Sequence, residues 1–99
     1  MVQIDVPLEK LSALCRRRHI RRLALFGSVL RKDFRPESDV DVLVEFEPGR
    51  TPGFEFVSIQ DELSALLGNR KVDLVSPKFL NRRIRDQVLK DAELVYEKK

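Results

Sequence analysis

Two aspartates, Asp39 and Asp41, interrupt an otherwise apolar stretch. On a β-strand, residues two apart face the same side and lie about 6.6 to 7 Å apart. The two carboxylates therefore project together, whereas Val40, Val42 and Val44 point the other way, into the core. Carboxylates this close raise each other's pKa unless a cation or a hydrogen-bond donor lies between them. Oxygen ligands at this density suit Mg²⁺, which also keeps places for water and substrate phosphates.

A Gly-Ser pair stands ten residues before these aspartates. Gly27 ends the preceding apolar run and has no side chain to obstruct a ligand. If a helix begins at Val29, the backbone N–H groups around Ser28 lie at its N-terminus and favour phosphate. Arg31 could add a charge-assisted bond to the same phosphates. Such a phosphate site beside two carboxylates suits a metal–triphosphate complex, although Ser28 as an ordinary N-cap and Arg31 on a solvated helix face remain open.

A third carboxylate stands in the segment KVDLV, where Asp73 is flanked by Val72 and Leu74. If this segment forms a strand beside the one that carries Asp41, Asp73 completes a site of three carboxylates. Such a site can hold two ions and take the proton from an attacking hydroxyl. An ordinary exposed position on an edge strand is the alternative for Asp73.

The composition excludes several other classes of protein and of metal site. The chain has 99 residues, of which 42% are hydrophobic and 35% charged, as in soluble globular proteins. No apolar run approaches the roughly 20 residues that span a bilayer, and no signal peptide is evident, so we expect no membrane contact and a cytoplasmic location. One Cys and one His exclude a thiolate or imidazole zinc cluster, so oxygen must hold any metal. The net charge of +3 does not argue for direct nucleic-acid binding.

Hydrophobic periodicity predicts an α/β fold, with a small mixed β-sheet flanked by helices, in a single domain over residues 1–99. Phe54 and Phe56 are expected in the core, where one of the two rings could line a base pocket. An exposed sheet edge leaves a homo-oligomer open. The predicted helices cover residues 7–18, 29–34, 54–67 and 80–89, and the predicted strands cover 21–26, 39–46, 72–75 and 94–96.

The spacing GS-x10-DxD between two apolar runs resembles the signature of the DNA polymerase β-like nucleotidyltransferases. The short length, the context LFGSVLRKDFRPESDVDVLVEF and the ending KFLNRRIRDQVLKDAELVYE resemble the minimal nucleotidyltransferase (MNT) branch. Members of this branch occur as the antitoxin half of HEPN/MNT toxin–antitoxin pairs. The resemblance implies the polymerase β-like fold and a nucleotidyltransferase that uses a nucleoside triphosphate.

The resemblance also implies roles for the carboxylates. Asp39 and Asp41 match the pair that binds two Mg²⁺ ions. Asp73 matches the third carboxylate, which holds the catalytic ion and assists deprotonation of the acceptor.

The phosphate-binding residues follow in the same way. Gly27 and Ser28 match the turn that contacts the triphosphate, and Arg31 lies near it. The next position is commonly Gly in the family and is Lys32 here. That departure leaves the fine geometry of nucleotide binding open.

The implied reaction is the Mg²⁺-dependent transfer of AMP from ATP to a hydroxyl. In antitoxins of this kind the acceptor is a tyrosine of the HEPN toxin partner. Two alternatives stay open: an antitoxin that inhibits its toxin by binding alone, and a transferase that acts on RNA ends or a small molecule.

Overall fold

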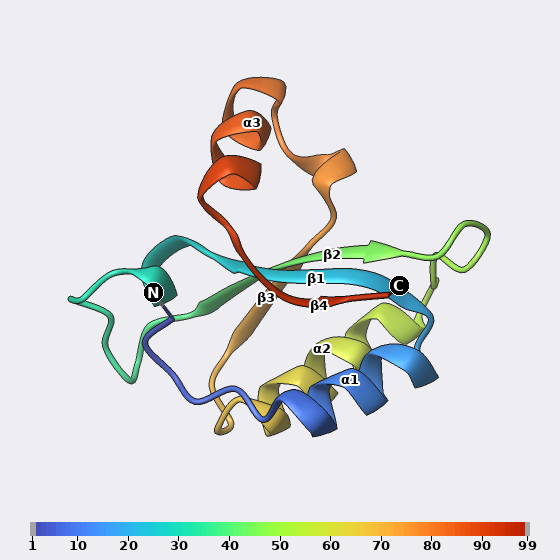
Figure 1. Ribbon diagram of the computed structural model, residues 1–99, viewed down its shortest axis with the longest axis horizontal. Helices are drawn as coiled ribbons and strands as arrows, with labels where there is room; N and C mark the ends of the chain where they lie inside the picture. The colour runs from blue at the N-terminus through green and yellow to red at the C-terminus, as the bar shows by residue number, and fades with distance from the viewer. Residues whose placement is uncertain (1, 99) are drawn as a thin grey trace.

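A four-stranded sheet with helices on both faces forms the frame of the protein (Figure 1). The structure, a computed structural model, describes residues 2–98. No helix within these residues is long and apolar enough to cross a membrane. The helices are α1 (Leu8–Arg17), α2 (Glu55–Leu66) and α3 (Arg82–Asp91), with the short 3₁₀ helices η1 (Gly27–Leu30) and η2 (Pro77–Phe79). The strands are β1 (Ile20–Phe26), β2 (Val40–Phe46), β3 (Val72–Val75) and β4 (Glu93–Glu97).

The sheet is mixed, as the sequence predicts. Its strand order is β3-β2-β1-β4, in which β1 pairs antiparallel with both β2 and β4. Strand β3 runs parallel to β2, and α2 forms the crossover between them. A parallel pair requires such a crossover because a tight turn reverses the direction of the chain and can therefore join only antiparallel strands. The expectation that the third strand lies beside the second is therefore confirmed.

The core lies between the sheet and the pair of helices α1 and α2, which cover one face together (Figure 1). Val40, Val42 and Val44 are fully buried in it, as the alternation along β2 predicts. Cys15 on α1 is also fully buried, and burial raises the pKa of its thiol to about 12. Both observations fit a small core residue whose thiol stays protonated at neutral pH.

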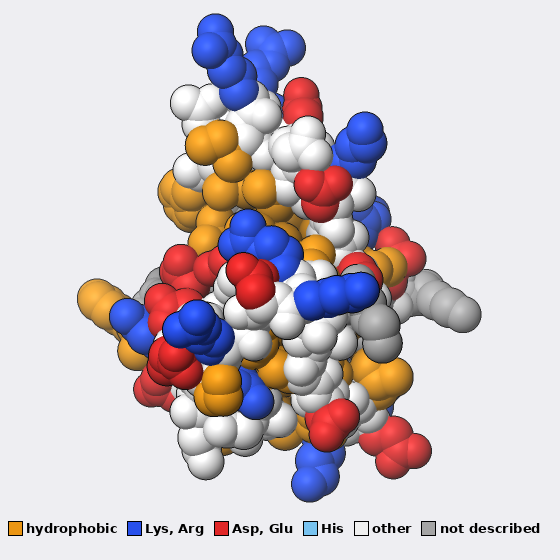
Figure 2. Space-filling view, turned by 90° about the vertical axis from the view of Figure 1, so that its left-hand side faces the viewer, with side chains coloured by type: hydrophobic (Ala, Val, Ile, Leu, Met, Phe, Trp, Pro, Cys, Tyr) orange, Lys and Arg blue, Asp and Glu red, His pale blue; other side chains and the backbone are white. Residues whose placement is uncertain are grey.

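The opposite face of the sheet carries α3, which contributes no buried residue. Four apolar side chains of α3 and its neighbours are exposed: Phe79, Ile84, Leu89 and Leu94. Figure 2 shows hydrophobic side chains gathered on the upper part of this side of the molecule, above a zone where acidic and basic side chains alternate. The chain thus has one well-covered sheet face and one sparsely covered face.

Three sequence expectations need correction. No α-helix follows Ser28: η1 lasts four residues, and Arg31 already has extended backbone angles (φ −100°, ψ 149°). Phe54 is fully exposed instead of lying in the core, while Phe56 is partly buried against it. The last helix starts two residues later than predicted because the Asn81 side chain caps it by accepting a hydrogen bond from the Arg83 N–H.

Candidate active site

The register of β1, β2 and β3 brings the predicted site residues to one place. Asp41 on β2 is directly opposite Asp73 on β3 and, on its other side, opposite Phe26, the last residue of β1. Gly27 follows Phe26 at once and therefore lies next to Asp41. Because Val40, Val42 and Val44 face α1 and α2, the side chain of Asp41 points to the opposite, α3-bearing face.

Asp41 is the electrostatic centre of this cluster. Burial of this half-buried carboxyl raises its pKa, and the nearby negative charges of Asp73 and Asp39 raise it further. The positive charge of Arg31 acts in the opposite direction. Four of the six residues singled out from the sequence are thus close enough to influence one another, and their excess negative charge suits a bound cation.

Gly27 not only lies next to Asp41 but is also the residue type that the space beside Asp41 requires. Its φ of +76° is in the left-handed region, which favours glycine. A Cβ atom at this position would overlap with Oδ2 of Asp41. The sequence predicts that this glycine leaves room for a ligand; in the structure the Asp41 carboxylate occupies that space.

Ser28 and Arg31 are held by the turn that follows. The Ser28 hydroxyl donates a long hydrogen bond of 3.5 Å to the backbone oxygen of Asp39, so it links η1 to the start of β2. The Arg31 N–H donates to the Ser28 backbone oxygen at 2.9 Å. Arg31 and Lys32 are both exposed. Both cations are therefore free to extend towards a phosphate, but the four-residue η1 is too short to provide a helix dipole.

Asp39 is engaged differently from the other two carboxylates. Its Oδ2 lies 3.9 Å from the ammonium group of Lys71, and both side chains are well exposed. Within residues 2–98, no three acidic, histidine or cysteine side chains stand close enough to hold a metal ion as they are arranged. The three carboxylates fit Mg²⁺ in their oxygen chemistry and their charge, while Asp39 is also paired with Lys71.

Two basic residues that contact this region, Lys71 and Arg70, were not predicted from the sequence. Besides Lys71, Arg70 lies with its guanidinium 5.6 Å from the Phe34 ring centroid, and it donates a 3.3 Å hydrogen bond to the Pro36 backbone oxygen. Arg70 therefore ties the segment between Ser28 and Asp39 to the start of β3. The sequence signal for both was the basic pair directly before the acidic strand VDLV.

Comparison with known proteins agrees with this arrangement. Residues 9–99 match the family model described as polymerase beta, nucleotidyltransferase. The protein adenylyltransferase MntA of Thermococcus cleftensis is 41% identical over 78 residues, which cover 78% of this chain and 74% of that protein.

Solved structures show the same fold. One chain assigned to the minimal nucleotidyltransferases superposes with a TM-score of 0.72 at 42% identity, over 87% of this chain and 86% of its own. A toxin–antitoxin complex with AMP-PNP gives a TM-score of 0.73 at 19% identity, over 95% of this chain and 76% of that chain. A complex of tri-AMPylated Shewanella oneidensis HEPN toxin with MNT antitoxin gives 0.64 at 19% identity, over 92% and 70% of the two chains. This chain belongs to the polymerase β nucleotidyltransferase family, as its GS-x10-DxD pattern predicts, and is a nucleotidyltransferase.

Proposed function

We propose that this protein is an antitoxin that transfers AMP from ATP to a tyrosine hydroxyl of a HEPN toxin. The observation that carries the proposal is the pairing of Asp41 with Asp73 across two parallel strands, with Gly27 pressed against Asp41. The relative named protein adenylyltransferase MntA supports the reaction. The toxin–antitoxin complexes of the same fold support the kind of partner.

Each residue of the site has a part in this reaction. The turn at Gly27 and Ser28, together with Arg31, binds the β- and γ-phosphates, because backbone N–H groups and a guanidinium recognise phosphate oxygens. Asp73 accepts the proton of the acceptor hydroxyl. Two Mg²⁺ ions held by Asp39, Asp41 and Asp73 would neutralise charge on the phosphates. The acceptor oxygen attacks the α-phosphorus, and pyrophosphate leaves from the opposite side.

The test is transfer of label from ATP to protein in an extract of the source cell. ATP labelled on its α-phosphate is expected to label one protein band with the wild type and Mg²⁺, and at least a hundredfold less with Asp41→Asn. ATP labelled on its γ-phosphate should give no band. Asp61→Asn, which removes an exposed carboxylate of α2 outside the cluster, is the matched control and should transfer normally.

The other outcomes have definite meanings. Full transfer by Asp41→Asn would contradict the proposal. Labelled RNA instead of protein would establish a transferase that acts on RNA ends. A partner that stays inhibited at stoichiometric Asp41→Asn, without added mass, would establish inhibition by binding alone.

A further inference from the structure

Lys71 lies on the same face of the sheet as the three carboxylates. The buried residues of β3 alternate with Lys71 and Asp73, which therefore point to the α3-bearing face. Because the parallel register pairs Val40 with Val72, the residues that precede them, Asp39 and Lys71, also lie beside each other. The Val40 N–H donates a 2.8 Å hydrogen bond to the Lys71 backbone oxygen, which joins the two segments at this point.

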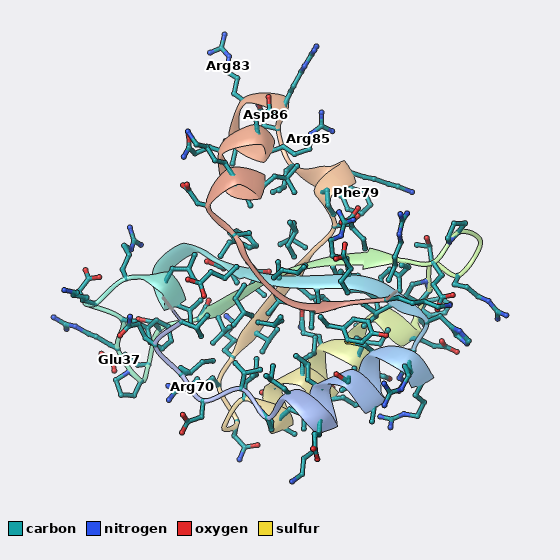
Figure 3. All side chains as sticks on the ribbon, viewed as in Figure 1. Glu37, Arg70, Phe79, Arg83, Arg85 and Asp86 are labelled. Carbon is teal, nitrogen blue, oxygen red and sulfur yellow. The ribbon has the colours of Figure 1, made fainter. Side chains whose placement is uncertain are left out.

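Asp39 is contacted from two sides of the chain. The Lys71 Nζ atom lies 3.9 Å from Oδ2 of Asp39, and the Ser28 hydroxyl donates its 3.5 Å hydrogen bond to the Asp39 backbone oxygen. The Lys71 ammonium group is therefore near the turn to which we assign the phosphates. Figure 3 shows Arg70, the residue before Lys71, close to Glu37 at this end of the sheet, and Arg70 donates its hydrogen bond to the backbone oxygen next to Glu37.

The contact between Lys71 and Asp39 is loose. The Lys71 side chain is 80% exposed, and 3.9 Å is longer than a hydrogen bond between an ammonium and a carboxylate group. An exposed ion pair of this kind contributes little free energy, so the ammonium group leaves it at little cost. Its flexible four-carbon stem lets the charge move to another anion nearby.

The proposed reaction supplies such an anion. Asp39 binds a metal ion in that reaction, and the triphosphate lies at the Gly27–Ser28 turn, so Lys71 loses one negative partner and gains another. The positive charge of Lys71 opposes the binding of a free divalent cation and favours the binding of a triphosphate. The same lysine thus acts in opposite directions on the two ligands.

We propose that Lys71 is a nucleotide-binding residue, whose ammonium group exchanges Asp39 for the triphosphate when the metal and the nucleotide bind. The exchange makes the site accept a metal–nucleotide complex in preference to the free metal ion. This inference rests on the proposed nucleotidyl transfer and adds to it a residue of the phosphate site and an order of binding.

The test measures metal and nucleotide binding separately by titration calorimetry. Mn²⁺ serves as the metal probe because it takes the same oxygen ligands as Mg²⁺. Lys71→Met should lower the dissociation constant of Mn²⁺ alone about threefold, because the competing charge at Asp39 is gone. It should raise the dissociation constant of AMP-PNP in saturating Mg²⁺ about tenfold, through loss of a charge-assisted bond to phosphate. Lys71→Arg keeps the charge and should bind AMP-PNP within about threefold of the wild type.

Two controls separate the exchange from a general effect of charge. Lys10→Met removes the same charge from an exposed position of α1, on the other face of the sheet, and should change each constant by less than about twofold. In an Asp39→Asn background, Lys71→Met should no longer tighten Mn²⁺ binding, because the lysine opposes the metal through Asp39.

The outcomes distinguish this inference from the proposed function. Weaker binding of both Mn²⁺ and AMP-PNP by Lys71→Met, no change in either, or an equal effect of Lys10→Met would overturn the exchange. Tighter Mn²⁺ binding that persists without Asp39 would overturn it as well. If the wild type and Lys71→Met bind AMP-PNP equally well, the role of Lys71 fails and the proposed function stands. If the wild type does not bind AMP-PNP in Mg²⁺, the proposed transfer itself fails.

Discussion

At the scale of single residues, the site depends on the contact between Gly27 and Asp41. The sequence identifies both residues, because a glycine at the end of one strand and an aspartate inside the next are unusual choices. It could not reveal that the glycine makes room for the carboxylate, since that contact joins two strands across the sheet. Lys71 and Arg70 were missed for a related reason: their contacts with Asp39 and Pro36 depend on the parallel pairing of β2 with β3.

Replacement of Gly27 by alanine should damage the site beyond its effect on the fold. The left-handed backbone alone should lower the free energy of unfolding by roughly 1 to 3 kcal/mol. The collision with Asp41 should in addition displace the carboxylate and lower the rate of AMP transfer about a hundredfold. Gly49→Ala is the matched control, since Gly49 has the same φ of +76° and no atom within 4 Å of the added carbon. Equal loss of transfer in the two variants would contradict this account.

The raised pKa of Asp41 predicts how the stability of the metal-free protein, kept in EDTA, depends on pH. Because the folded protein binds this proton more tightly than the unfolded chain, stability falls as pH rises from the ordinary aspartate range through the raised pKa. Asp41→Asn has no charge to bury and should therefore unfold at a higher urea concentration than the wild type at pH 7. The difference should vanish below about pH 3, where both forms are neutral. If Asp41→Asn is less stable than the wild type at pH 7, the burial and the neighbouring carboxylates do not destabilise the charged form of Asp41, and this prediction is wrong.

At the scale of elements, alternation along β2 and helical spacing in α1 and α2 could be predicted because each is a local pattern. The prediction of an α-helix after Ser28 was wrong because the apolar side chain there packs into the core from a shorter turn. Val29 is fully buried in the core, and the chain must then extend from Arg31 through a charged, proline-containing segment to reach β2. A four-residue 3₁₀ turn satisfies both requirements, whereas an α-helix would carry the chain away from the strand.

The packing of α1 on α2 is reinforced by Glu62, which accepts hydrogen bonds from Arg18 and, at 2.6 Å, from Arg17. These bonds, chiefly that from Arg18, lower the pKa of Glu62. A lowered pKa contributes stability above the ordinary glutamate pKa, and this contribution is lost as pH falls through the folded value. Glu62→Gln should therefore lower the free energy of unfolding by about 0.5 to 1 kcal/mol at pH 7.

The pH and salt dependence of this loss is measurable by urea unfolding. The gap between Glu62→Gln and the wild type should close below about pH 4 and shrink in 1 M salt. Glu9→Gln, on the exposed part of α1, should leave stability within about 0.5 kcal/mol of the wild type. A gap that persists at low pH would indicate lost packing instead of lost charge.

At the scale of the whole molecule, the two faces of the sheet differ in how firmly they are covered. Helices α1 and α2 bury apolar side chains against one face, whereas α3 stands over the other with none fully buried (Figure 1). The sequence predicts α3 as a helix from the spacing of its apolar residues. It could not predict that these residues stay exposed, because exposure depends on how the helix is placed on the sheet. The sparsely covered face is also the face to which the Asp41 side chain points.

This asymmetry predicts that α3 opens more readily than the rest of the chain. Helices α1 and α3 both have ten residues, but α1 buries Leu11, Leu14 and Cys15, and α3 buries none. Few buried contacts mean a low free energy of local opening, so the backbone amides of α3 should exchange with deuterium at least tenfold faster than those of α1. Because η2 leads into α3, the same motion should extend to η2 and its exposed Phe79 ring. Equal protection of the two helices would contradict this prediction.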